Sequence, residues 1–269
     1  MKPASLASSL LIQKCESSDQ LAKVLPQTLE ALEEVYKNSG RYETPALIVE
    51  QMLIGDLYSV DTYITSDGAM FHCPPVYYTS GQSLGVDDFF LYKRTAPASL
   101  DDAEWQLCCS AVESAIRAIG LTATTAHVEL CRTQAGWKII EVGPRVGRYR
   151  VELYREVYGI DHSSNDIKVR FGLTPEISTA IAKHCAVYSI YPLEEGRLDS
   201  VAYASEVNQL PSLLYTRRLI QDGAVVRHAK HGGHAIMEVI LSHSDSDQFE
   251  RDCLWFESHV KAVVADTTT

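Results

Sequence analysis

The spacing of apolar positions changes several times along the chain, and each change marks an expected helix or strand. Helical spacing begins after Ser17, which forms a capping box with Gln20 ahead of apolar residues at every third or fourth position. Pro26 lies inside this stretch and predicts a kink or two short helices, because proline has no N–H for the helical hydrogen bond. A second helix is predicted from Asp101, with Glu104 completing its capping box.

Strand patterns occupy the stretches between these helices. The continuous apolar run PALIVEQMLIG at 45–55 predicts a buried strand, and residues 57–72 alternate around an SDGA turn, as a hairpin does. Residues 149–170 return to helical spacing with one break. From His184 onward, short strand-like segments separated by glycine-containing turns lead to a closing helix over 245–264. This mixture predicts an α+β fold with a β-rich C-terminal part.

Another hairpin is predicted where the strand-like segments HVELCR and WKIIEV flank the break TQAG. If its turn centres on Ala135, facing residues have numbers that add to 270, so Glu129 faces Glu141. Their Cβ atoms would then be about 5 Å apart. Like charges in that position need protonation, solvent or a cation between them. A slipped register, with one glutamate turned to solvent, is the alternative.

A divalent cation between the two carboxylates would relieve their repulsion and would also indicate a function. Mg²⁺ takes oxygen ligands and is often held by one or two carboxylates together with substrate phosphates. Arg145 follows Glu141 by four residues, at the end of the strand, and is placed to meet the same phosphates. The hairpin therefore points to a metal–phosphate site.

Composition narrows the class of protein. The 269 residues are 46% hydrophobic and 22% charged, which is ordinary for a globular chain. A formal net charge of −11 without a Lys/Arg run argues against nucleic acid and anionic membranes as partners. There is no apolar run of membrane-spanning length and no convincing signal peptide, so a cytoplasmic protein is expected. Its seven cysteines form no CxxC pair and are expected to be reduced. The histidine cluster at 228–234 is interpreted as a loop rather than a metal site.

Four features follow one another in a fixed order: Lys-Pro before a Ser-rich loop, VEQML before a glycine, HVEL, and EVGPR. This order resembles the ATP-grasp superfamily of ATP-dependent carboxylate ligases over roughly residues 1–175. The wording GPRxGxYR and the strand-rich tail resemble its amino-acid ligase and biotin-carboxylase-like branches. The resemblance implies a partial lid subdomain with a hinge at 1–55, a central antiparallel-sheet catalytic subdomain at 56–180 and a β-rich C-terminal cap at 181–269.

The resemblance also implies roles for single residues at the nucleotide. Lys2 is similar to the phosphate-binding lysine of the lid, where a point charge neutralises phosphate oxygens, although an exposed N-terminal lysine is the simpler interpretation. The Ser-rich loop that closes over the triphosphate would contain Ser5, Ser8 and Ser9. The hinge that binds adenine would consist of Glu50, Gln51, Met52 and Leu53, and Asp56 would reach the ribose.

The same resemblance implies that Glu129 and Glu141 are ligands of Mg²⁺ or Mn²⁺ and that Arg145 contacts the γ-phosphate or the acyl-phosphate. Arg148 and Arg150 would bind a substrate carboxylate, with exposed arginines at a helix edge as the alternative. The implied cofactors are ATP and the metal ion, and the implied partners are a small-molecule carboxylate and an amine joined through an acyl-phosphate. A non-catalytic nucleotide-binding fragment or regulatory subunit is the alternative function, and an interaction domain without nucleotide is a third.

The sequence departs from the family pattern at three places. Gly143 occupies a position where the family has Asn, which removes one oxygen ligand of the second metal. Arg148 occupies a position where glycine is common. The family also has an α/β domain and further lid strands before the lysine at position 2. Either Met1 is an artificial or mispredicted start, or the chain is a genuine truncation with another function. The expected protein partner is a second copy of the chain or a protein that supplies the missing N-terminal domain.

Overall fold

The computed structural model describes residues 1–6, 10–231 and 233–265. The α-helices are α1 (Ser18–Asn38), α2 (Asp102–Ile119), α3 (Arg150–Tyr158), α4 (His162–Arg170) and α5 (Ser246–His259), and short 3₁₀ turns lie at η1 (Gln82–Leu84), η2 (Glu206–Gln209) and η3 (Ala229–His231). The first strands are β1 (Lys2–Pro3), β2 (Leu47–Ile48), β3 (Asp56–Ile64), β4 (Met70–His72), β5 (Val76–Ser80), β6 (Leu91–Ala96), β7 (Thr124–Thr133) and β8 (Gly136–Gly143). The remaining strands are β9 (His184–Ile190), β10 (Gly196–Val201), β11 (Leu213–Arg218), β12 (Val225–Val226), β13 (Met237–His243) and β14 (Ala262–Ala265).

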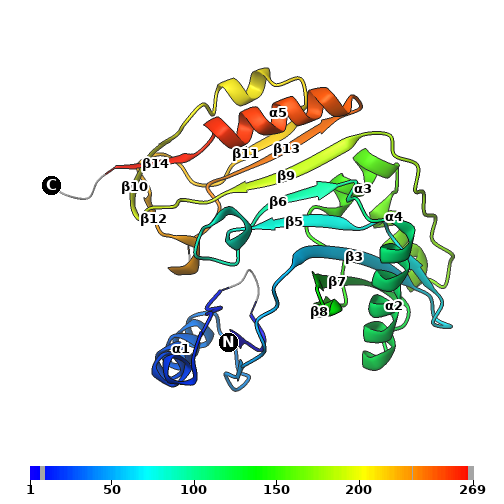
Figure 1. Ribbon diagram of the computed structural model, residues 1–269, viewed down its shortest axis with the longest axis horizontal. Helices are drawn as coiled ribbons and strands as arrows, with labels where there is room; N and C mark the ends of the chain where they lie inside the picture. Colours follow the sequence, from blue (N-terminus) through cyan, green and yellow to red (C-terminus); the bar gives the residue numbers. More distant parts are fainter. Residues whose placement is uncertain (7–9, 232, 266–269) are drawn as a thin grey trace.

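One large sheet organises the molecule (Figure 1). Its nine strands run in the order β11-β13-β9-β6-β5-β3-β7-β8, with β4 paired to β3, and each pair is antiparallel. A smaller sheet joins β12, β10 and β14, and β1 pairs with β2. The expected α+β fold with a central antiparallel sheet is confirmed.

Helices cover both faces of the large sheet. Val60 and Val128 pack against Val112 of α2, whereas Tyr63, their neighbour on the opposite face, packs with Leu153 of α3. In the C-terminal part, α5 packs on the same face of the sheet as α2. The register shows this, because paired residues on neighbouring strands point to the same side of a sheet. The face opposite α2 and α5, covered in part by α3 and α4, is called the α3 face below.

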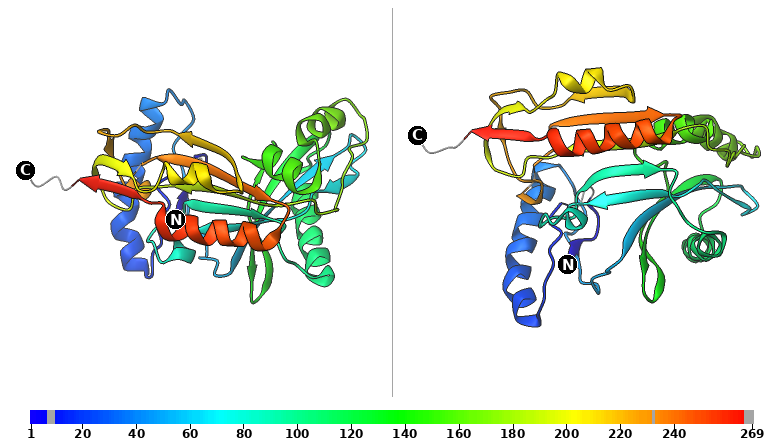
Figure 2. Two further views of the ribbon diagram at one scale, coloured as in Figure 1. Left: turned by 90° about the horizontal axis from the view of Figure 1, so that it is seen from above. Right: turned by 45° about the horizontal axis from the view of Figure 1, so that its top comes forward.

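The N-terminal segment stands apart from the rest. In the views of Figures 1 and 2, α1 and α2 lie at opposite sides of the molecule. The N-cap at Ser17 is confirmed, since its side chain accepts the Gln20 N–H at 3.1 Å. The second bond of the expected capping box is not formed with Ser17, because Gln20 Oε1 accepts the Glu16 N–H at 2.8 Å instead. The alternative of two short helices is wrong, because α1 continues through Pro26.

Two further expectations need correction. The apolar run at 45–55 forms only the two-residue β2, and Met52 and Ile54 are 38% and 83% exposed. It lacks burial because its one strand partner, β1, is equally short. The closing helix ends at His259 instead of reaching residue 264, since β14 turns away to pair with β10.

The large sheet continues across residue 180, where the sequence pattern changes. β9 pairs with β6, and β13 and β11 extend the sheet beyond β9. Strands from both sides of that position therefore share one hydrogen-bonded sheet. Among the described residues, no helix is long and apolar enough to cross a membrane.

Candidate nucleotide and metal site

Glu129 and Glu141 pair as the sequence predicted, but the register between them and the turn differs from the predicted one. Glu129 on β7 and Glu141 on β8 are direct partners, which confirms their pairing. Near the turn, however, Arg132 pairs with Trp137, so those numbers add to 269. A β-bulge between the pairs Leu130–Ile139 and Glu129–Glu141 inserts Ile140 and restores the sum of 270. Without that extra residue, Glu141 would lie on the other face of the sheet.

Lys2 joins the N-terminal segment to this bulge. Its Nζ donates to the carbonyl oxygen of Ile140 at 3.3 Å and forms an ion pair with Glu50 Oε2 at 2.7 Å. The lysine, the hinge glutamate and the strand that carries Glu141 therefore meet, although they lie far apart in the sequence.

Glu129 is held from below by a buried polar cluster on the α3 face. Its Oε1 contacts His127 Nε2 at 3.3 Å and the Tyr78 hydroxyl at 3.5 Å. His127 Nδ1 lies 2.5 Å from Asp61 Oδ1, and His162 Nε2 lies 2.8 Å from Asp61 Oδ2. Because both ring nitrogens of His127 face carboxylate oxygens, the geometry suits an imidazolium that donates at each.

Electrostatics agree with this assignment. Burial alone would lower the pKa of His127, but the charge and hydrogen bond of Asp61, together with Glu129, raise it above its usual value. Burial alone would raise the pKa of Glu129, but His127 outweighs it, helped by Arg150 and Arg94, and the pKa of Glu129 is lowered. Glu129 is therefore an ionised carboxylate at neutral pH, as a metal ligand must be.

Gly143 and Arg145 border the same face. Gly143 pairs with His127 and so points to the side of Glu129 and Glu141. The nearest atoms to a Cβ built on Gly143 would belong to the Arg145 side chain, at 3.7 Å, which is an ordinary contact distance. Arg145 is exposed and donates to the Val146 carbonyl at 3.1 Å. Its guanidinium is thus free to reach an anion above the glutamate pair.

The two other arginines of the loop have different environments. Arg148 is exposed over 66% of its side chain and forms an ion pair with Glu238 at 2.6 Å. Arg150 is fully buried, and its guanidinium donates to Ser59 Oγ at 2.6 Å and the Tyr78 hydroxyl at 2.5 Å. Arg148 is therefore accessible to solvent, whereas Arg150 lies inside the protein.

The remaining predicted residues lie around the N-terminal segment. Ser5 contacts the Tyr36 hydroxyl at 2.6 Å, whereas Ser8 and Ser9 lie outside the described residues. Asp56 is tied to Arg132 at 2.7 Å. The hinge has no regular structure apart from β2, and its exposed part consists of Glu50, Gln51 and Met52, with Leu53 half-buried.

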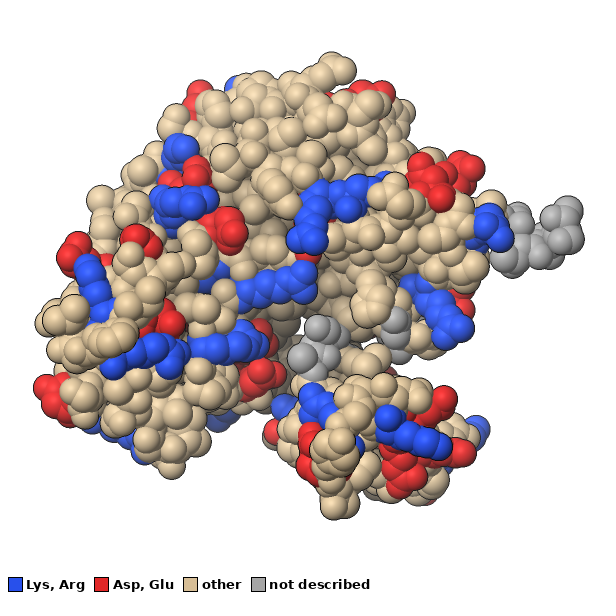
Figure 3. All heavy atoms as spheres, turned by 180° about the vertical axis from the view of Figure 1, so that it is seen from behind, with Lys and Arg blue, Asp and Glu red and all other residues tan. Residues whose placement is uncertain are grey.

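The space between the N-terminal segment and the sheet is open to solvent. Figure 3 shows a gap there, with both Lys/Arg and Asp/Glu side chains along its borders.

The residues present fit a magnesium ion that is also held by phosphates. Two facing carboxylates supply hard oxygen donors, which is the number that Mg²⁺ commonly takes from a protein in such sites. Within the described part of the chain, no group of three His, Cys, Asp or Glu side chains is arranged to hold a metal without such help.

Sequence reasoning missed the support beneath Glu129. The period of two in HVEL places His127 on the face of Glu129, so His127 had a local signal. Asp61 shares its face of β3 with Leu57, Ser59 and Tyr63, which is a weaker signal. Tyr78, Arg150 and His162 join the cluster only through tertiary contacts, so the sequence had no comparable signal for them.

Comparisons with known proteins identify chains of similar fold. The chain is similar to the crystal structure of L-amino acid ligase from Bacillus licheniformis, with a TM-score of 0.73 and 20% identity over 91% of this chain and 61% of that one. It is also similar to the biotin carboxylase domain of 2-oxoglutarate carboxylase from Hydrogenobacter thermophilus, solved with MgADP and bicarbonate. The TM-score there is 0.64, with 14% identity over 97% and 57% of the two chains.

A curated relative is an uncharacterized protein, y4rH, from Sinorhizobium fredii, which is 22% identical over 86% of this chain. The chain spans 46% of that relative and about three-fifths of the two solved chains. A family model described as an ATP-grasp domain matches residues 1–151. Since that match covers more than half of the 269 residues, the chain belongs to the ATP-grasp family.

Proposed function

We propose that the protein is an ATP- and Mg²⁺-dependent ligase that joins a small-molecule carboxylate to an amine through an acyl-phosphate. The observation that carries this proposal is the direct pairing of Glu129 with Glu141 beside Lys2. The two carboxylates are suited to bind the metal ion, and Lys2 and the exposed Arg145 are suited to bind phosphate oxygens.

The chemistry would proceed in two transfers. An oxygen of the substrate carboxylate attacks the γ-phosphorus of ATP, the bond to the bridging oxygen breaks, and ADP leaves. The amine nitrogen then attacks the acyl carbon, inorganic phosphate leaves, and the nitrogen gives up a proton. Neither transfer needs a nucleophile from the protein; both need positioning and neutralised charge.

The residues of this chain have separate parts in that scheme. Glu129 and Glu141 would hold a magnesium ion, which supplies charge neutralisation on the β- and γ-phosphates. Lys2 would exchange its ion pair with Glu50 for phosphate oxygens, and Arg145 would bind the transferred phosphoryl group. The exposed apolar side chains at Met52 and Ile54 would be covered by adenine.

One observation favours a second candidate. Gly143 provides no oxygen for a second metal, and a chain that binds MgATP with a single metal site can serve as a nucleotide-binding subunit without turnover. Phosphate release in the presence of amino-acid pairs distinguishes the ligase from this alternative.

The test is calorimetry of ATP with and without Mg²⁺ on the wild type and on Glu129→Gln plus Glu141→Gln. We expect magnesium-dependent binding that weakens at least about tenfold in the double variant, because both metal ligands are gone. Glu34→Gln, on the exposed surface of α1, is the matched control and should bind like the wild type. Unchanged magnesium dependence in the double variant would rule out the hairpin as the metal site.

A further inference from the structure

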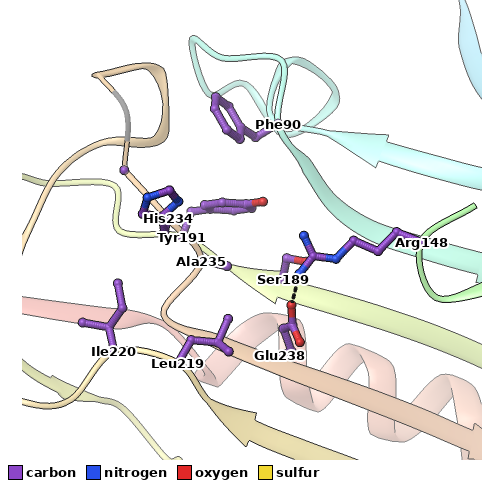
Figure 4. Close-up of a pocket in the computed structure, with 10 residues that line it drawn as sticks. Phe90, Arg148, Ser189, Tyr191, Leu219, Ile220, His234, Ala235 and Glu238 are labelled. Atoms are coloured by element: carbon purple, nitrogen blue, oxygen red, sulfur yellow. Dashed lines mark hydrogen bonds and ion pairs between the residues drawn. The ribbon is translucent and has the colours of Figure 1, made fainter. Parts of the chain in front are cut away.

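A cavity of about 330 Å³ opens on the α3 face, away from the glutamate pair (Figure 4). It is lined by residues at the end of β9 and in β13, by Phe90 before β6, by residues 219–220 and 233–235, and by Arg148. Its volume is at the lower end of the range of ligand sites, about 300–1,000 Å³. The cavity is therefore sized for a small molecule.

One end of the cavity is formed by the ion pair of Arg148 and Glu238, which can accept and donate further hydrogen bonds. Glu238 is only 5% exposed at its side chain and accepts from Arg148 Nη2 at 2.6 Å and from the Tyr149 hydroxyl, both at Oε1. Within the described residues, Oε2 of Glu238 has no hydrogen-bond donor. Arg148 uses one nitrogen for Glu238, so its other N–H groups remain for an acceptor. The pair offers an acceptor for a cation next to donors for an anion.

The other end is mostly apolar and partly aromatic, and His234 is also among its lining residues. Phe90 and Tyr191 meet edge to face with ring centroids 5.4 Å apart, and Leu219 and Ile220 lie across from them. Figure 4 shows these side chains on one side of the cavity and the Arg148–Glu238 pair on the other. An occupant would be charged at one end and apolar at the other.

A series of contacts joins this cavity to the glutamate pair. The Tyr78 hydroxyl lies 3.5 Å from Glu129, and Tyr78 is the cross-strand partner of Arg94. Arg94 donates to Ser189 Oγ at 3.2 Å, and Ser189 pairs with Glu238. Paired residues of a sheet point to one side, so cavity and hairpin share the α3 face.

We infer that this cavity binds a free α-amino acid with an apolar or aromatic side chain. Its ammonium contacts Glu238, its carboxylate contacts Arg148, and its side chain packs among Phe90, Tyr191 and Leu219. The amino-acid carboxylate then lies next to the loop that carries Arg145. That this amino acid is a substrate of the ligase rests on the proposed function; its binding does not.

The test is calorimetry of L-leucine and L-phenylalanine without ATP or Mg²⁺. Isocaproate lacks the ammonium of leucine and isoamylamine lacks the carboxylate, so each should bind about tenfold or more weakly. L-Aspartate and L-lysine should bind more weakly than leucine, because their charged side chains would be desolvated against the apolar wall.

Variants assign the contacts. Glu238→Gln should weaken the binding of leucine about tenfold or more and leave the binding of isocaproate unchanged. Arg148→Gln should weaken the binding of leucine and leave the binding of isoamylamine unchanged. Leu219→Asn tests the apolar wall. Matched controls are Glu250→Gln on α5 and Leu214→Asn on β11, both exposed, which should bind leucine like the wild type.

Leucine that binds no tighter than isocaproate, binds equally well to Glu238→Gln, or does not bind at all would overturn the inference. The ATP experiment is separate. Leucine binding without magnesium-dependent ATP binding would support the amino-acid site and contradict the proposed ligase function. Magnesium-dependent ATP binding without leucine binding would support nucleotide binding and contradict the amino-acid site.

Discussion

Gly143 is the single residue at which the candidate site departs most from the family pattern. It points to the side of both glutamates, and a side chain there would touch Arg145 at an ordinary distance. Its φ lies outside the left-handed region that only glycine adopts freely. The backbone therefore accepts a side chain at this position.

Gly143→Asn is expected to strengthen magnesium-dependent ATP binding several-fold, because it adds an amide oxygen beside the carboxylates. A magnesium titration at fixed ATP measures the effect. Gly143→Ala is the matched control, since it adds the Cβ without the oxygen. Equal behaviour of the two variants would show that the amide oxygen does not reach the metal.

Asp61 is the anion at the centre of the buried cluster. It accepts from His127, His162 and the Gly147 N–H, and Arg150 Nε lies 3.9 Å away. Burial alone would raise its pKa, but the charges and hydrogen bonds of both histidines hold the pKa of Asp61 far below its usual range.

Asp61→Asn should lower the free energy of unfolding by about 3–5 kcal/mol at neutral pH, because it leaves a buried cationic cluster without its anion. The folded-state pKa of Asp61 lies below the unfolded one. Its contribution is therefore present above about pH 4 and is lost as the pH falls below that value.

Urea unfolding at several pH values measures both effects, with the exposed Asp199→Asn as control. The wild type should lose stability in acid more steeply than the Asn variant. Parallel pH curves for the two proteins would contradict the assignment of the charge to Asp61.

Single elements differ in how far local sequence determined them. The caps at Ser17 and Asp101 were predictable, because the residues that make them lie within three positions of each other. The glutamate pairing was predictable from the turn to within one residue, and the bulge at Ile140 supplied the rest. No local signal marks that bulge.

Other elements depend on distant partners. The run at 45–55 has the composition of a buried strand, but the described chain supplies only β1 beside it. The contacts of Tyr78, Arg150 and His162 join four elements, β3, β5, α3 and α4, so their part in the candidate site became visible only in the folded structure. Periodicity predicts faces of elements, whereas tertiary packing decides what meets on them.

Asp101→Ala should lower the free energy of unfolding by about 1 kcal/mol, because Asp101 Oδ1 accepts the Glu104 N–H at 2.8 Å at the start of α2. Chemical denaturation measures it. Asp102→Ala removes a neighbouring charge without the cap and should have a smaller effect. A larger loss for Asp102→Ala would mean that charge, and not the cap, stabilises this end of the helix.

At the scale of the whole molecule, one sheet connects most of the chain. The core beneath α3 contains Tyr63 and Val76 from before residue 180 and Val187 and Ile240 from after it. The pairing of β6 with β9 crosses the same position. The parts on either side are therefore expected to depend on each other for folding.

A truncated chain of residues 1–180 should fail to fold, because it exposes the edge of β6 and opens the core beneath α3. Circular dichroism and size-exclusion chromatography measure this, with the full chain as control. A monomeric, cooperatively folded product would instead show that residues 56–180 form an independent domain.

The bulge at Ile140 has a second consequence that does not involve chemistry. Among the described strands, none pairs with the outer side of β8, so this strand ends the sheet. An exposed edge strand invites pairing with another molecule, and bulges and lysines are common protections against it. β8 has both, with Lys138 two residues before Ile140, and Lys2 occupies the carbonyl of Ile140. The bulge that aligns the two glutamates therefore also makes this edge of the sheet a poorer partner for a strand of another molecule.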